Sequence, residues 1–122
     1  MSQLKLGTRD DQTVFRPGEE IQGAAGWQLD PPPKSVEVRL FWYTRGKGTE
    51  DAAVVETVRF DDPKPEEARP FRFTVPDAPY SFSGKLISLI WALELVAEPG
   101  PESTRLDLLV SPSGKEIRLG KP

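Results

Sequence analysis

Hydrophobic and polar residues alternate along most of this chain, which is the pattern of β-strands that bury one face. The alternation recurs at residues 35–44, 52–60, 71–75, 105–110 and 116–119. In 35–44 the apolar side consists of Val36, Val38, Leu40 and Trp42. In 52–60 the alternation places Val54 on the same side as Val58 and Phe60. Each segment is predicted to be a half-buried strand.

The segment 85–98 is ambiguous, because its Leu, Ala and Glu residues favour a helix. Ser88, Glu94 and Glu98 all occupy even positions, so a strand would collect them on one face and leave the other face entirely apolar. A helix, which turns about 100° per residue, would place Ser88 and Glu94 on separate sides and interrupt its apolar stripe. The segment is therefore predicted to be a long central strand.

Prolines and glycines gather between these strands, at 30–34, 61–67, 76–79 and 99–101. Gly84 lies where a β-carbon is expected to block the turn before the long strand. Ser111-Pro-Ser-Gly114 is typical of a tight turn with Gly114 at a positive φ, and is expected to join the last two strands as a hairpin. About eight strands separated by turns predict an all-β protein, a two-sheet antiparallel sandwich or a barrel, formed by one domain over residues 1–122.

Composition and charge limit which partners and which cellular compartment are expected. Acidic and basic residues are mixed, with a net charge of -3, so no basic face is expected and no nucleic-acid partner is predicted. The most apolar stretch, 86–97, is too short for the roughly 20 residues of a membrane span. The N-terminus lacks the apolar core of a signal peptide, so a cytoplasmic protein is expected.

The chain contains no cysteine and no histidine. A thiolate nucleophile, a Cys-ligated zinc and a histidine general base are thereby excluded. Four pairs of adjacent carboxylates occur without the spacing of a calcium loop, and they are interpreted as solvated loop charges. We therefore expect no enzymatic activity, no catalytic residue, no metal site and no cofactor.

The strand at 35–44 carries aromatic residues on both faces at its end. Trp42, like Trp91 on the long strand, is predicted to fill the core. Phe41 and Tyr43 lie on the opposite face, so either a loop of the chain or its N-terminal segment, or else a protein partner, is expected to cover them. Together with Arg45 and Lys47 in the adjoining glycine-rich loop, they form the predicted partner-binding site.

The predicted partner is a protein of unspecified identity, and a second copy of the chain, giving a homodimer, is one alternative. Another alternative is a site for a small ligand or a carbohydrate, in which Trp27 would join Phe41 and Tyr43 in an exposed stacking surface. That alternative requires the three rings to be exposed in a row.

Two stretches resemble a known family. The first is Phe15-Arg-Pro-Gly-Glu-Glu-Ile-Gln-Gly23, a turn followed by a strand. The second is Phe71-Arg-Phe-Thr-Val-Pro76, the loop Pro79-Tyr-Ser-Phe-Ser-Gly84 and the long strand with its central Trp91. Over residues 14–97 this arrangement resembles the arrestin-like β-sandwich superfamily, an immunoglobulin-like architecture. Its members include arrestins, the arrestin-like subunit of retromer and bacterial sporulation-control proteins.

The resemblance implies a scaffold or adaptor that binds other proteins through strand edges and loops, without chemistry of its own. Arrestins have two such sandwiches in tandem, whereas this chain has room for one, so a single-domain form is implied. The buried charged cluster that arrestins use as a switch cannot be identified in the sequence, and no switching mechanism is transferred.

Overall fold

The strands are organised as two layers in a computed structural model, which describes residues 3–46, 50–84, 86–98, 102–115 and 117–118. The short helix η1 (Arg9–Asp11) follows the first strand. The strands are β1 (Gln3–Thr8), β2 (Val14–Phe15), β3 (Glu20–Gln28), β4 (Ser35–Gly46), β5 (Ala52–Phe60), β6 (Glu66–Thr74), β7 (Phe82–Ser83), β8 (Ile87–Glu98), β9 (Ser103–Val110) and β10 (Ile117–Arg118).

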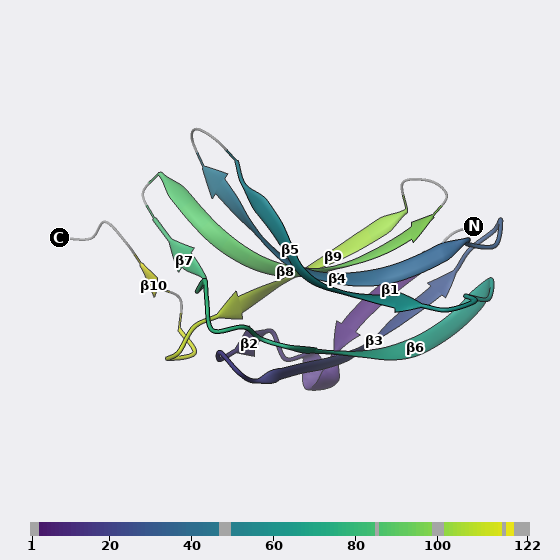
Figure 1. Ribbon diagram of the computed structural model, residues 1–122, viewed down its shortest axis with the longest axis horizontal. Coiled ribbons are helices and arrows are strands. Elements are labelled where there is room, and N and C mark those ends of the chain that lie inside the picture. The colour runs from purple at the N-terminus through teal and green to yellow at the C-terminus, as the bar shows by residue number, and fades with distance from the viewer. Residues whose placement is uncertain (1–2, 47–49, 85, 99–101, 116, 119–122) are drawn as a thin grey trace.

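The smaller sheet has the order β1-β3-β6, and the larger sheet has the order β10-β7-β8-β4-β5. In the larger sheet β9 also pairs with β8, on the edge that β7 uses, and β2 pairs with β9. Figure 1 shows β3 and β6 in one layer and β4, β5 and β8 in the other. All of the long pairings are antiparallel. Among the residues that the structure describes, only the two-residue pairings of β2 with β9 and of β7 with β10 are parallel. The predicted two-sheet antiparallel sandwich is confirmed.

The core lies between the inner faces of the two sheets. Strand β8 is the long central strand that the positions of its polar residues predict, paired with β4 along twelve residues. Trp91 is fully buried on its inner face, and the indole nitrogen donates a hydrogen bond to the carbonyl oxygen of Pro79 at 2.9 Å. Large buried side chains of the core include Phe15, Ile21, Trp27, Leu40, Phe60, Phe71, Phe73, Trp91, Leu93 and Leu95.

The turn before β8 requires a glycine, as predicted. The Gly84 N–H donates to the carbonyl oxygen of Ile87 at 2.9 Å, which closes the turn. A β-carbon on Gly84 would lie 2.5 Å from the same carbonyl oxygen, closer than atoms in van der Waals contact can approach. The turn therefore excludes any side chain at this position.

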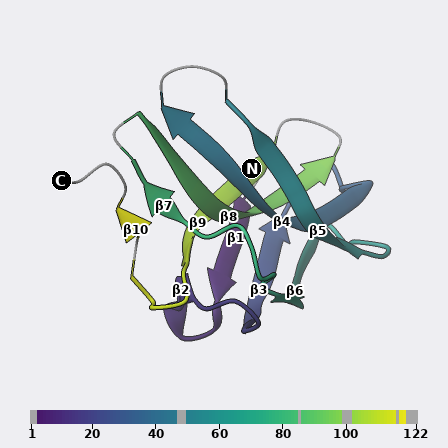
Figure 2. The same cartoon turned by 60° about the vertical axis from the view of Figure 1, so that its left-hand side comes forward.

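The predicted hairpin after β9 is wrong, although its turn is present. Gly114 has a φ of +74° and donates its N–H to the carbonyl oxygen of Ser111 at 3.3 Å. Strand β10 then pairs with β7 and not with β9, and Figure 2 shows these two strands side by side. The end of β9 has no free edge, because Val110 pairs with Phe15 on one side and bonds Ser81 on the other.

The predicted alternation in β5 is also wrong in its first half. The pairing of β4 with β5 shifts between Leu40 and Phe41, so that Leu40 lies opposite Glu56 but Phe41 lies opposite Val54. One extra residue in a strand reverses which face the following side chains occupy. Val54 consequently lies on the outer face of the larger sheet beside Phe41, and is 56% exposed.

Candidate functional site

The outer face of the larger sheet carries the aromatic residues that the sequence singled out. Phe41 and Tyr43 point outward from β4, and their rings stack with centroids 5.9 Å apart and planes inclined by 29°. Tyr43 lies opposite Ile90 of β8, and Phe41 lies between Val54 of β5 and Ala92 of β8. We call Phe41, Tyr43, Val54 and Ile90 the aromatic face.

Side chains of β9 cover part of the aromatic face. The Arg105 guanidinium lies 4.7 Å from the centroid of the Tyr43 ring, and the Tyr43 hydroxyl donates to Asp107 Oδ1 at 3.2 Å. Ala92, which lies between Phe41 and Asp107, has no exposed surface. The chain itself therefore supplies some cover over the aromatic residues, but from strand β9 of the same sheet, where a loop or the N-terminal segment was expected. Phe41 and Tyr43 remain half-buried.

The environment of Tyr43 changes its acidity. Burial raises the pKa of the phenol above its ordinary value of 10.0, and the negative charge of Asp107 raises it further. The guanidinium of Arg105 acts in the opposite direction. The phenol is consequently held in its neutral form, in which it can donate a hydrogen bond to the carboxylate.

A row of alternating charges borders the aromatic face. Glu37 pairs with Arg39 and, at 3.5 Å, with Arg59. Arg39 lies opposite Glu94 of β8, and its Nη1 is 4.0 Å from Glu94 Oε1. These ion pairs join β5, β4 and β8 across the surface of the sheet.

The structure brings together part of the predicted site and adds to it. Arg45 is exposed at the end of β4, where it lies opposite Ser88, whereas Lys47 lies outside the described residues. Ile90, which the sequence reasoning did not name, could have been found there, because it shares even positions with the polar residues of β8. Val54 could not, because the bulge that brings it to this face has no signal in the alternation.

Trp27 does not belong to this surface. It points inward from β3, is only 4% exposed, and packs against Phe60 with ring centroids 5.5 Å apart. Its indole nitrogen donates to the carbonyl oxygen of Lys64 at 2.7 Å, which satisfies its polar atom within the core. The exposed row of three aromatic rings needed for the predicted stacking surface is therefore not formed.

An ion pair stands beside Trp27 at the edge of the sandwich. The Arg69 guanidinium donates to both carboxylate oxygens of Glu67, at 2.7 and 3.1 Å, and the backbone N–H of Lys64 donates to the same carboxylate at 3.0 Å. The hydrogen bonds from Arg69 and Lys64 lower the pKa of Glu67 below its ordinary value of 4.5. These contacts fix the loop between β5 and β6 to the β6 strand.

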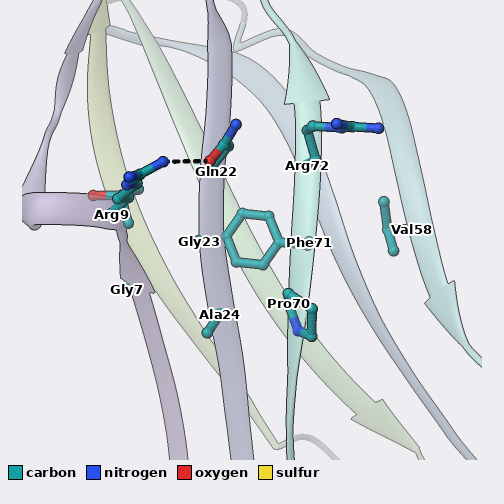
Figure 3. Close-up of a pocket in the computed structure, with 10 residues that line it drawn as sticks. Gly7, Arg9, Gln22, Gly23, Ala24, Val58, Pro70, Phe71 and Arg72 are labelled. Atoms are coloured by element: carbon teal, nitrogen blue, oxygen red, sulfur yellow. Dashed lines mark hydrogen bonds between the residues drawn. The ribbon is translucent and has the colours of Figure 1, made fainter.

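A hollow with a volume of about 800 Å³ lies at the smaller sheet, lined by residues of β1, β3 and β6 and by Val58 of β5. Small residues form much of its floor, including Gly7, Ala24 and Pro70. In Figure 3 the ring of Phe71 is directed towards Gly23, and a hydrogen bond of 3.2 Å from Arg9 Nη1 to Gln22 Oε1 is drawn beside it. No sequence motif indicated this hollow, which arises because neighbouring strands carry small side chains at paired positions.

The described residues contain neither a cluster of metal-binding side chains nor a helix that could span a membrane. In these ranges no group of three or more Asp, Glu, His or Cys side chains is placed to hold a metal ion. Within the same ranges, no helix has the length and apolar character needed to cross a membrane.

The order and packing of the strands define an arrestin-like β-sandwich. No protein-family model matches the chain, and a search of curated proteins found no match to its sequence. Among solved structures, the chain is similar to Spo0M, a sporulation control protein from Bacillus subtilis, with a TM-score of 0.63 and 20% sequence identity. The similarity covers 89% of this chain and 49% of Spo0M, so the chain spans about half the length of that protein. At this level of identity the likeness shows the fold alone.

Proposed function

We propose that this chain is a non-enzymatic, cytoplasmic protein–protein interaction domain that binds its partner through the aromatic face. The observation that carries the proposal is the combination of stacked, half-buried aromatic rings with the exposed Val54 on one sheet surface. Aromatic residues and arginine are enriched at the energetic centres of protein interfaces. Here Arg39 and Arg105 flank the aromatic rings, so both kinds of residue are present on one surface.

The rigidity of the surface supports the same function. Phe41 and Tyr43 lie on the twelve-residue strand β4, which is hydrogen-bonded on both sides, and Arg105 and Asp107 hold Tyr43 in place. A binding surface whose side chains are already ordered loses less conformational entropy on association than a mobile loop does. The likeness to a protein named for sporulation control supports a regulatory setting for such a domain.

Binding by the whole chain can be tested at one residue. Val54→Arg places a charge in the aromatic face at a site that is already exposed, so the fold should tolerate it. Ala68→Arg is the matched control, because Ala68 is exposed on the outer face of the smaller sheet. Both variants should unfold at the wild-type temperature in a circular dichroism melt.

The measurement is the affinity for a purified partner, identified by site-specific photocrosslinking from position 54 and from position 68. We expect crosslinking and saturable binding that depend on position 54, with Val54→Arg weakening the affinity about tenfold or more. Binding that is unchanged by Val54→Arg but lost in Ala68→Arg would place the interface on the opposite sheet and contradict the proposal.

A further inference from the structure

We infer that the partner of the aromatic face is a second copy of this chain, packed face to face about a two-fold axis. The inference rests on the proposed function, because it names the occupant of the same surface. It is carried by the pairing register of β4 and β8, which fixes the outward residues that lie side by side.

Three neighbouring rows of outward residues on β4 and β8 are complementary pairs. One row contains Arg39 beside Glu94, and the adjacent rows contain aromatic residues of β4 beside aliphatic residues of β8. These three central rows therefore carry matching kinds of side chain on β4 and β8, whereas the end rows, Glu37 beside Val96 and Arg45 beside Ser88, do not match. The aliphatic neighbours are Ala92 for Phe41 and Ile90 for Tyr43.

A two-fold axis parallel to the strands and midway between β4 and β8 exchanges the two positions of each row. Arg39 of one copy then faces Glu94 of the other, and Glu94 of the first faces Arg39 of the second. Tyr43 likewise faces Ile90 of the other copy. An isologous interface requires such self-complementarity, and an unrelated partner would have to present the same pattern independently. Packed sheets cross at about 30°, so the match applies to the central rows, nearest the point where the strands of the two copies cross.

The charge of this surface also permits a second copy to approach. The whole chain has a net charge of -3, which opposes self-association. Around the aromatic face, however, three acidic residues are paired with three basic residues: Glu37, Glu94 and Asp107 with Arg39, Arg59 and Arg105. The surface is thus close to balanced, with one further positive charge from the exposed Arg45 at the end of β4. Balance also disfavours an anionic lipid surface, which is recognised by an excess of positive charge.

The test uses charge reversals in the full chain, measured by sedimentation equilibrium at concentrations that bracket the wild-type Kd. Arg39→Glu makes both members of the row acidic, and Glu94→Arg makes both basic. Each variant alone should dimerise about tenfold or more weakly than the wild type, because like charges then face each other across the axis. A one-to-one mixture of the two variants should dimerise with nearly the wild-type affinity, because the acidic row then faces the basic row.

Two further variants control for folding and for surface charge. The double variant Arg39→Glu with Glu94→Arg restores the ion pair within the chain and between copies, so it should recover the dimer. Arg72→Glu makes the same charge change on the smaller sheet, where the Arg72 side chain is 69% exposed, and should leave the Kd unchanged. Thermal melts establish that each variant is folded.

A wild-type chain that sediments as a monomer at every concentration would overturn the inference, as would a mixture of the two variants that stays monomeric. Strong binding of a different purified protein, lost in Val54→Arg, would also overturn the inference while leaving the proposed function intact. Loss of the wild-type dimer in Arg72→Glu but not in Arg39→Glu would contradict both.

Discussion

Gly23 on β3 offers a direct test of how closely the smaller sheet is packed. A β-carbon at Gly23 would collide with the carbonyl oxygen of Gly7 and lie 2.5 Å from Cζ of Phe71. Neither neighbour can move freely, because Gly7 belongs to β1 and the buried Phe71 ring packs against Phe73 with centroids 5.7 Å apart. The ring of Phe71 thus occupies the space that a side chain at Gly23 would need (Figure 3).

The expected size of the effect follows from two opposing contributions. An unstrained replacement of glycine by alanine stabilises a protein by about 0.4–1 kcal/mol, through the unfolded chain. Forcing a methyl group into a packed site costs about 1–3 kcal/mol. The contact with Gly7 involves backbone and cannot relax by rotation of a side chain, so Gly23→Ala should lower the free energy of unfolding by about 2 kcal/mol. For a domain of this size the unfolding temperature should fall by roughly 5–10 °C.

The control is Gly26→Ala, three positions later on the same strand. Its nearest neighbours would be the β-carbons of Ala68 and Lys5, both at 3.9 Å, which is ordinary van der Waals contact. Gly26→Ala should therefore be neutral or slightly stabilising in urea unfolding followed by circular dichroism. If Gly23→Ala were as stable as Gly26→Ala, the packing of Phe71 over β3 would be refuted.

Three other perturbations have defined outcomes. Trp27→Phe keeps most of the ring but leaves the Lys64 carbonyl without its donor, and should cost about 1–2 kcal/mol in chemical unfolding; an unchanged midpoint would contradict the bond. The pKa of Glu67 is lowered in the folded state, so its stabilising contribution is present above pH 4.5 and is lost as the pH falls through the lower folded value. Glu67→Gln should therefore flatten the acid limb of a stability–pH curve, and a curve parallel to the wild type would show that the pairing with Arg69 is absent in solution. Tyr43→Phe should remove an absorbance transition that lies above pH 10.0 in an alkaline titration, and the survival of that transition would contradict the contacts that raise the pKa of Tyr43.

Much of the sandwich was predictable because the alternation of apolar and polar residues is a property of each strand's own sequence. The even positions of Ser88 and Glu94 alone identified β8 as a strand, and the motif ending in Gly84 located its start. The aromatic pair Phe41 and Tyr43 was found in the same way, since both fall on the polar side of an alternating strand. The number of strands and their inward faces therefore needed little more than the side-chain period of two.

The features that the sequence did not indicate are those that depend on which strands become neighbours in the fold. The bulge opposite Leu40 is a property of the pairing of β4 with β5, and it moved Val54 from the expected inner face to the aromatic face. The hairpin after Ser111 was expected from its turn residues, but the edge of β9 was already occupied. The sequence did not indicate whether the Trp27 side chain is buried, because that depends on how the opposite sheet packs against its strand.

The sequence by itself determined that this protein is an all-β sandwich with a strand at 87–98 and aromatic residues on the outer side of β4, because these features follow from local alternation and turn chemistry. The tertiary structure decided what surrounds those aromatic residues. Arg105 and Asp107 lie more than sixty positions after Tyr43 in the chain, and they reach it only because β9 pairs with β8. It also placed Arg39 beside Glu94, since register is set by backbone hydrogen bonding between strands and by the burial of their inner faces.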